Sequence, residues 1–181
     1  MLAEKPLDSN GCEIPWMNYN IVNFLKERFK KNMLLFEYGS GFSTKFYSKY
    51  VLKVTSVEHD KKWYEVISTD KPKNCKIIYS KYDNQMMGGD YSKMILNQNE
   101  IFNVIVVDGR DRVNCIKNSI NALDKDGIVI LDDSSREKYK PAFEFMQSNG
   151  FKQITFSGLK SSGRKDDFTT IFYKEDNCFE I

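Results

Sequence analysis

The segment 34–44 reads L-L-F-E-Y-G-S-G-F-S-T, so a short apolar run, an acid, a Gly-x-Gly turn and an amphipathic stretch follow one another. This order predicts a strand, a tight loop and a helix N-terminus, which is where open α/β sheets bind nucleotide-like ligands. Glu37 stands just before the glycines, where its carboxylate is expected to face a ligand lying across the loop. Because Thr44 replaces the third glycine of a dinucleotide fingerprint, the segment favours a nucleoside without a pyrophosphate over NAD.

Length and composition are those of a globular protein with a full hydrophobic core. The chain has 181 residues, of which 41% are hydrophobic and 29% are charged, and this predicts one domain over the whole chain. We expect an N-terminal extension at 1–17, a leading helix at 18–31 and an α/β core at 33–174. The net charge of +2 gives no electrostatic argument for nucleic acid or a membrane as partner.

The sequence contains no pattern typical of a signal peptide or a membrane span. The N-terminus lacks an apolar core, and no apolar run approaches about 20 residues. We therefore expect a cytoplasmic protein. The four cysteines are widely separated and form no C-x-x-C pair, which argues against a zinc site and predicts reduced thiols.

Hydrophobic periodicity predicts that strands and helices alternate along the chain. Strands are expected at 33–38, 51–58, 75–79, 102–108, 128–131, 151–158 and 167–174. Helices are expected at 18–31, 42–50, 63–68, 91–96, 113–123 and 136–149. Alternation that ends in two consecutive strands predicts a doubly wound, mostly parallel sheet with an antiparallel edge.

Small and acidic residues gather where the predicted strands end. They are Glu37, Gly39, Ser40 and Gly41 on the first strand, Glu58 and His59 on the second, Asp108 and Gly109 on the fourth, and Asp132 and Asp133 on the fifth. In an open α/β sheet these ends border the ligand crevice. Glu58 follows the glycine loop by about 20 residues, where an acid accepts hydrogen bonds from a ribose diol. A ribose without a pyrophosphate beside a Gly-x-Gly turn suggests S-adenosylmethionine.

Four motifs in this order resemble those of the class I, Rossmann-like, S-adenosylmethionine-dependent methyltransferases. They are E-Y-G-S-G, S-V-E-H-D, V-I-V-V-D-G-R and D-G-I-V-I-L-D-D. The resemblance extends over residues 18–174 and includes the last strand, F-T-T-I-F-Y-K. It implies a seven-stranded sheet in the order 3-2-1-4-5-7-6, with the last strand antiparallel and helices on both faces. It also implies transfer of a methyl group from a sulfonium to a nucleophile.

The strand-end positions and the resemblance together predict the cofactor-binding residues. These are Glu37, Gly39, Ser40, Gly41, Ser43, Thr44, Glu58, His59, Asp83, Asp108 and Gly109. Ser43 and Thr44 suit the first turn of the helix that follows the loop, and Asp83 follows the third strand, where the family often contacts adenine. For His59, the only histidine, a structural role is the alternative. Trp63 is interpreted either as a packing residue or as a residue that stacks on adenine. Trp16 is interpreted either as part of a flap over the cofactor or as a tether for the first helix.

Methyl transfer to a hydroxyl also requires removal of a proton, or a metal that lowers the hydroxyl pKa. Asp108, Asp132 and Asp133 are the candidate catalytic residues, as a base or as metal ligands. They resemble the metal site of catechol-type O-methyltransferases, in which an Asp and an Asp-Asn pair hold a divalent cation. Here Asp133 stands at the Asn position, and its carboxylate is still an oxygen ligand that suits Mg²⁺. A Mg²⁺ site and a site without metal therefore both stay open.

The motifs favour O-methylation of a small-molecule or sugar hydroxyl, and E-x-G-S-G-x-S-T resembles a group that contains glycan-related O-methyltransferases. The alternatives are N-methylation of a protein or nucleic acid and a non-catalytic S-adenosylmethionine-binding module. Loops 81–91 and 160–166 are expected to select the acceptor, and the oligomeric state stays open, with a homodimer as one alternative. Four basic residues near the strand ends either bind an acidic substrate or form exposed salt bridges: Arg110, Arg112, Arg136 and Lys138.

Overall fold

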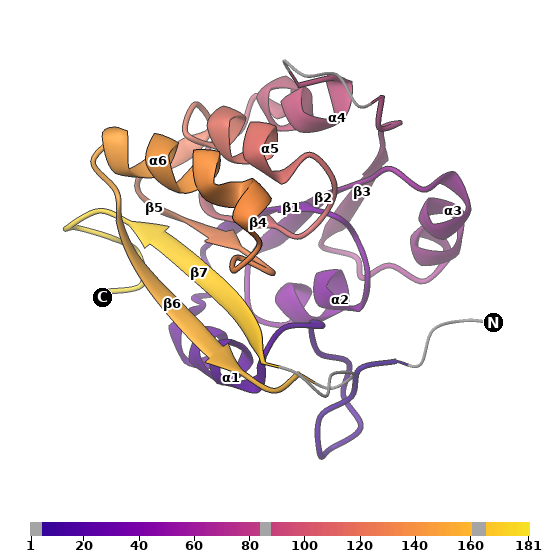
Figure 1. Ribbon diagram of the computed structural model, residues 1–181. Helices are drawn as coiled ribbons and strands as arrows, with labels where there is room; N and C mark the ends of the chain where they lie inside the picture. The colour runs from indigo at the N-terminus through magenta and orange to yellow at the C-terminus, as the bar shows by residue number, and fades with distance from the viewer. Residues whose placement is uncertain (1–4, 84–87, 161–165) are drawn as a thin grey trace.

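Seven strands form one mixed sheet in the computed structural model, which describes residues 5–83, 88–160 and 166–181 (Figure 1). They lie in the order β3-β2-β1-β4-β5-β7-β6, and β7 runs antiparallel to both of its neighbours. The strands are β1 (Leu34–Tyr38), β2 (Lys53–Glu58), β3 (Cys75–Tyr79), β4 (Phe102–Val107), β5 (Leu123–Leu131), β6 (Lys152–Gly158) and β7 (Asp167–Tyr173). The predicted fold class and strand order are confirmed.

Helices cover both faces of this sheet (Figure 1). They are α1 (Tyr19–Arg28), α2 (Phe42–Ser48), α3 (Lys61–Thr69), α4 (Asp90–Lys93), α5 (Arg112–Ser119) and α6 (Lys140–Ser148), with 3₁₀ turns at Met94–Gln98 and Glu137–Tyr139. One hydrophobic cluster joins α1 and α2 to the sheet, and a second joins α4, α5 and α6 to its opposite face. α3 packs against β2 and β3 at the far edge.

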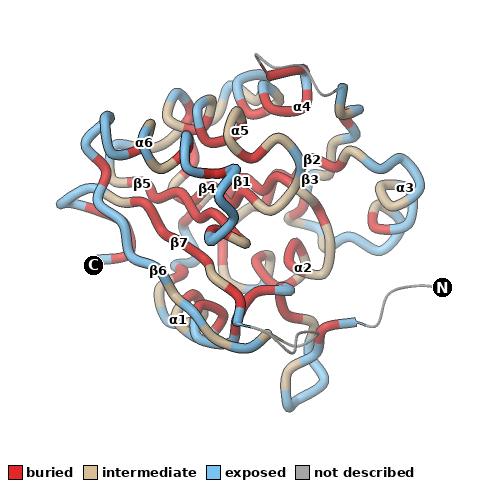
Figure 2. The backbone as a smooth tube through the Cα atoms, in the orientation of Figure 1, coloured by how far each residue is buried: buried red, intermediate tan, exposed pale blue. Residues whose placement is uncertain are grey.

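Alternate residues of the central strands enter these two clusters, as strand geometry requires. On β4, Val104 and Val106 belong to the α1–α2 cluster, whereas Ile105 and Val107 belong to the other. All four are fully buried, and Figure 2 shows the central strands as the buried interior of the molecule. The continuous apolar run of β4 is therefore explained by helices on both of its faces.

The predicted extents of several helices are wrong. The helix predicted at 113–123 ends at Ser119, and β5 begins at Leu123 instead of at residue 128. Leu123 pairs with Phe102 at the start of β4, and the register then shifts before Val104 pairs with Ile128. Pairing with β4 thus draws 123–127 into the strand. The helix predicted at 136–149 likewise divides into a 3₁₀ turn and α6.

The segment before α1 packs along the molecule and places side chains in two environments. Ile14 and Met17 enter the α1–α2 cluster, while Pro6 and Trp16 line a cavity at the carboxyl edge of the sheet. Among the described residues, no helix is both long and apolar enough to cross a membrane.

Candidate active site

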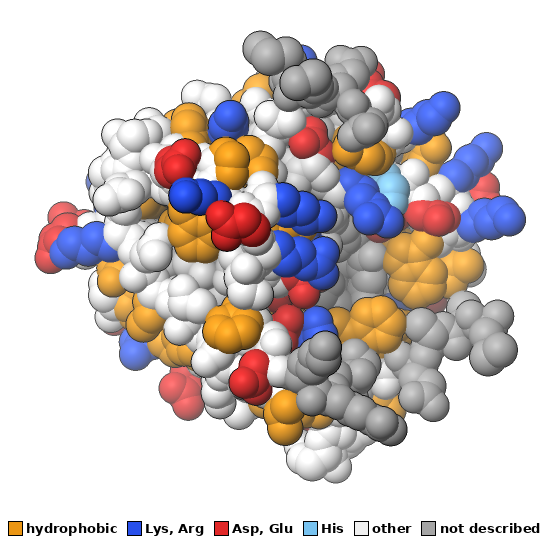
Figure 3. All heavy atoms as spheres, in the orientation of Figure 1, with side chains coloured by type: hydrophobic (Ala, Val, Ile, Leu, Met, Phe, Trp, Pro, Cys, Tyr) orange, Lys and Arg blue, Asp and Glu red, His pale blue; other side chains and the backbone are white. Residues whose placement is uncertain are grey.

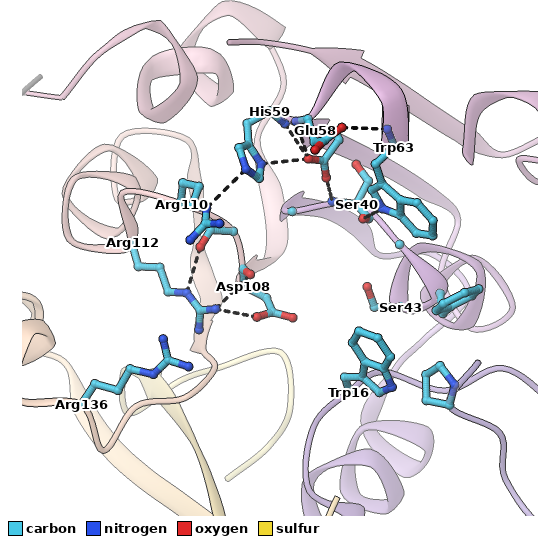
Figure 4. A pocket seen from close by; sticks show the side chains of 16 residues that line it. Trp16, Ser40, Ser43, Glu58, His59, Trp63, Asp108, Arg110, Arg112 and Arg136 are labelled. Atoms are coloured by element: carbon cyan, nitrogen blue, oxygen red, sulfur yellow. Dashed lines mark hydrogen bonds and ion pairs between the residues drawn. The ribbon is translucent and has the colours of Figure 1, made fainter. Parts of the chain in front are cut away.

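A cavity of about 600 Å³ opens at the carboxyl ends of β1, β2 and β4 (Figure 4). This volume lies within the usual range of small-molecule and cofactor sites. Eight predicted site residues line it: Gly39, Ser40, Gly41, Ser43, Glu58, His59, Asp108 and Gly109. Figure 3 shows basic side chains around a hollow on this face of the molecule. The parallel strands thus bring together residues that lie as much as 70 positions apart (Gly39 to Gly109).

Gly39 allows the loop after β1 to contact the loop after β4. Its φ is +92°, which disfavours any residue with a side chain. A Cβ atom at this position would lie 2.8 Å from the Cα of Gly109. At Gly41, by contrast, a Cβ would approach no atom closer than 4.0 Å. The first glycine therefore serves the close packing of two loops, and the second leaves open space beside the backbone.

Glu37 lies beneath the glycine loop and not in the cavity wall, where its side chain was expected. It is fully buried, and its carboxylate accepts hydrogen bonds from Ser43 Oγ, from Thr44 Oγ1 at 2.5 Å and from Ser56 Oγ at 2.8 Å. Burial raises the pKa of Glu37 to about 7, although the three hydroxyl donors oppose the shift. Thr44 is also buried, and its Oγ1 accepts from Gly41 N at 2.9 Å. Both side chains thus hold the loop and the start of α2 in place.

Glu58 lines the cavity while it organises the two loops beside it. Its Oε1 accepts from the backbone N of His59 and of Asp60, each at 2.8 Å, and its Oε2 accepts from Ser40 N at 3.1 Å. Because a carboxylate oxygen offers about two acceptor sites, Oε2 retains capacity for one further donor. The side chain therefore has a fixed orientation before any ligand arrives.

His59 and Arg110 lie next to Glu58 on one side of the cavity (Figure 4). His59 Nδ1 lies 2.8 Å from Glu58 Oε1, and Arg110 Nε donates to His59 Nε2 at 3.3 Å. This chain of contacts sets the imidazole between an acid and a guanidinium. His59 therefore lies beside Glu58 at the cavity wall.

Aromatic side chains line the opposite side of the cavity. Trp16 and Phe42 meet edge to face with ring centres 6.3 Å apart, and Phe42 meets Trp63 at 5.8 Å. Trp63 Nε1 donates to Ser40 O at 2.8 Å, which ties α3 to the glycine loop. Both tryptophans therefore border the cavity and also pack against neighbouring structure.

Only one of the three candidate catalytic acids lines the cavity. Asp108 keeps 25% of its side chain exposed there, whereas Asp132 is buried and accepts from Thr169 Oγ1 at 2.8 Å. Burial raises the pKa of Asp108, and burial together with the charge of Asp108 raises that of Asp132 well above its usual range. Burial would also raise the pKa of Asp133, but Arg112, Lys160 and Arg136 together lower it.

These three acids do not fit a divalent cation. One oxygen from each lies within 4.8 Å of the others, which is close enough for the three acids to share one ion. The guanidinium of Arg112, however, lies among them and forms ion pairs with Asp108 at 2.8 Å and with Asp133 at 3.4 Å. Hard cations need free oxygen ligands at about 2.0–2.6 Å, and here an internal cation already neutralises those oxygens.

The structure places Asp83 away from this cavity. Its side chain is exposed, and a Cβ on Gly89 would overlap its carboxylate, so the two residues lie against each other. Residues 84–87 of the first predicted acceptor loop and 161–165 of the second lie outside the described residues.

Sequence reasoning missed the role of Arg112. It was considered as a substrate ligand or as part of an exposed salt bridge, but its side chain is only 8% exposed and pairs with acids from two strand ends. Asp108 and Arg112 are four residues apart, but Asp108 lies in the loop before α5, so helical spacing gave no signal for their ion pair. The pairs with Asp132 and Asp133 depend on the neighbouring strand, and local spacing carries no sign of them.

Among the comparisons with known proteins, the one with solved structures bears on the fold. Neither a family model nor a curated protein matches the sequence. Solved structures do match, among them an O-methyltransferase from Bacillus cereus in complex with SAH, with a TM-score of 0.65 at 13% identity, over 84% of this chain and 78% of that chain.

Two further solved structures are of methyltransferases whose names give different acceptors. An rRNA methylase from Streptococcus thermophilus has a TM-score of 0.61 at 15% identity, over 84% of this chain and 92% of that chain. A precorrin-6y C5,15-methyltransferase from Geobacter metallireducens has a TM-score of 0.62 at 13% identity, over 86% and 87%. The chain therefore has the fold of the class I, Rossmann-like, S-adenosylmethionine-dependent methyltransferases.

Proposed function

We propose that this protein is an S-adenosylmethionine-dependent methyltransferase that methylates a hydroxyl oxygen of a small molecule or sugar. The observation that carries the proposal is the cavity that unites the glycine loop, Glu58 and Asp108 at the carboxyl ends of three strands. The fold supports it, since structural neighbours include a methyltransferase in complex with SAH.

The residues around the cavity suit the cofactor. In this proposal Glu58 Oε2 accepts from the ribose, and the open backbone at Gly41 borders the aminoacyl part, with Ser43 and Gly109 on either side. Glu37 and Thr44 act indirectly, because their hydrogen bonds hold the loop in its shape. A preorganised loop of this kind lowers the cost of ordering the site when the ligand binds.

Asp108 is the proposed general base. S-adenosylmethionine supplies a methyl group on a positively charged sulfur, and the chain must align an acceptor oxygen and remove its proton. Asp108 lies on the cavity wall, and its raised pKa brings it closer to neutral pH, where a base works most effectively. Asp132 is buried directly after β5 and lies close enough to Asp108 for their charges to interact.

Two alternatives compete with O-methylation. N-methylation of a protein or nucleic acid is less well supported, since an acid that accepts a hydroxyl proton suits an oxygen nucleophile. A binding module without catalysis would bind the cofactor and lack a role for Asp108. The Asp108 variant described below separates this module from an enzyme.

Calorimetry with SAH tests the cofactor part of the proposal. We expect the wild type to bind SAH and Glu58→Gln to bind it at least about 10-fold more weakly, because a charged hydrogen bond contributes about 1.5–3 kcal/mol. Glu65→Gln, on the exposed face of α3, is the matched control and should bind as the wild type does. No binding of SAH by the wild type, or equal binding by Glu58→Gln, would contradict the proposal.

A transfer assay tests the catalytic part. Asp108→Asn should keep SAH affinity within about twofold and reduce methyl transfer by about 10²–10⁴-fold, as removal of a general base does. The assay uses labelled S-adenosylmethionine with panels of hydroxylated small molecules, oligosaccharides, RNA and protein. Label that appears only on RNA or protein would instead favour the N-methylation alternative.

A further inference from the structure

The side chain of Arg112 occupies the centre of the acidic cluster formed by Asp108, Asp132 and Asp133. Its Nη2 lies 2.8 Å from Asp108 Oδ1 and 3.4 Å from Asp133 Oδ2, and its Nη1 lies 3.9 Å from Asp132 Oδ2. A single guanidinium thus reaches all three of these acids, whose oxygens are spaced for a metal ion. Its charge lies where a divalent cation would have to sit.

Backbone carbonyl groups hold this guanidinium in place. Nε donates to Gly109 O at 3.0 Å, Nη2 to Asp108 O at 3.0 Å and Nη1 to Asp132 O. The carbonyls belong to the loops after β4 and β5, so Arg112 also ties these two strand ends together. A side chain with this many fixed partners and 8% exposure is part of the fold, unlike a mobile surface ion pair.

Two further cations lie beside the cluster and form ion pairs with Asp133. Lys160 Nζ lies 3.6 Å from Asp133 Oδ1 and 3.0 Å from Asp167 Oδ1, and Arg136 Nη2 lies 2.5 Å from Asp133 Oδ2. Three cations of the chain therefore lie among four acids, Asp167 included. A metal ion would have to enter beside permanent positive charges, which repel it.

We propose that Arg112 is a built-in replacement for a divalent cation at this site, and that the protein therefore works without metal. The guanidinium balances the charge of the acids and fixes the orientation of the Asp108 carboxylate at the cavity wall. It acts as a positioning residue, because its ion pair at 2.8 Å holds the Asp108 carboxylate. This positioning role rests on the proposed methyl transfer, whereas the replacement of the metal does not.

Mn²⁺ binding, followed by electron paramagnetic resonance on the full chain, tests the replacement. We expect no Mn²⁺ to bind to the wild type, and Mn²⁺ to bind once Arg112→Met removes the charge and keeps the aliphatic stem. Adding Asp133→Ala to Arg112→Met should abolish this binding. Arg112→Lys, which keeps the charge, and the control Arg110→Met, which removes an exposed charge outside the cluster, should both stay without Mn²⁺.

The wild-type measurement decides the question even where Arg112→Met fails to fold. Mn²⁺ that binds to the wild type and is lost in Asp133→Ala overturns the proposal, and so does a folded Arg112→Met that binds none. Near-ultraviolet circular dichroism reports whether each variant is folded. Because Mn²⁺ binding is read without SAH, a failure of the proposed function leaves this result interpretable.

Transfer kinetics test the positioning role. Arg112→Met should lower kcat by about 10-fold or more with SAH affinity within about twofold, and Arg112→Lys should recover part of that loss. A chelator should leave the wild-type rate unchanged. Equal loss in both variants, or a wild-type rate that a chelator abolishes and Mn²⁺ restores, would overturn the proposal.

Discussion

Glu37 places an ionisable carboxyl group in the protein interior, where the charged form is costly. Three hydroxyl groups donate to it and offset part of this cost. Burial still dominates and raises its pKa to about 7, from 4.5 in an unperturbed chain. Between these two pH values the folded protein holds a proton on Glu37 that the unfolded chain has released.

This difference predicts how stability depends on pH. Since the folded state binds more protons, the free energy of unfolding should fall as pH rises from about 4.5 to about 7, by about 3 kcal/mol from Glu37 alone. Urea denaturation of the wild type and of Glu37→Gln at about pH 5 and about pH 8 checks this. The variant should lose less stability between the two. The raised pKa values of Asp108 and Asp132 also lower stability as pH rises, but equally in the wild type and in Glu37→Gln. An equal loss of stability in the two proteins would therefore show that Glu37 does not titrate in this range.

At the scale of elements, the site depends on how closely two loops approach each other. The loop from β1 to α2 contacts the loop from β4 to α5 at Gly39 and Gly109, where no side chain would fit. Gly150, which ends α6, also has a positive φ, of +79°, but an added Cβ there would meet no atom within 4 Å. A comparison of Gly39 with Gly150 therefore separates the cost of a left-handed backbone from the cost of steric crowding.

Alanine substitutions at these two glycines should therefore differ in cost. Gly150→Ala should lose about 1–2 kcal/mol from the left-handed backbone alone. Gly39→Ala adds a clash with Gly109 and should lose about 2–4 kcal/mol. Urea denaturation measures both losses. Equal values would mean that the two loops move apart at no cost to make room for the alanine side chain at position 39.

For the molecule as a whole, Asn18 joins the first helix, α1, to the last two strands, β6 and β7. Its Oδ1 accepts from Ile21 N at 3.0 Å and caps α1, while its Nδ2 donates to Phe156 O on β6 at 3.2 Å. Its backbone N donates to Asp167 Oδ2 on β7 at 3.1 Å. The residue is fully buried, so α1 is anchored to the last two strands of the sheet.

Loss of this anchor should destabilise the whole protein. Asn18→Ala removes the helix cap and leaves Phe156 O without its side-chain donor, for an expected loss of about 2–4 kcal/mol. Asn20→Ala, which removes one exposed bond to Ser157 O, is the control and should lose about 1 kcal/mol or less. Thermal unfolding measures the stability lost in both variants. If Asn18→Ala loses no more stability than Asn20→Ala, Asn18 is not the residue that anchors α1 to the sheet.

Much of the fold was predictable because periodicity is a local property. The bounds of β3 were predicted to the residue, and Gly150 ends α6 in the left-handed conformation that a helix-ending glycine adopts. The C-terminal end of α5 was not predictable in the same way. Residues 120–123 suit a helix by themselves, but 120–122 form a turn, and the pairing of Leu123 with Phe102 places Leu123 in β5.

By itself, the sequence determined the alternation of strands and helices and the gathering of Gly39, Glu58 and Asp108 at one edge, since parallel strands end on the same side of a sheet. The tertiary structure alone decided how the charges are placed. The carboxylate of Glu37 was expected to face a ligand across the glycine loop, but it is buried beneath that loop. The guanidinium of Arg112 lies among the acids that suggested a metal site. Burial and charge pairing act between residues brought together by folding, so no local pattern encodes them.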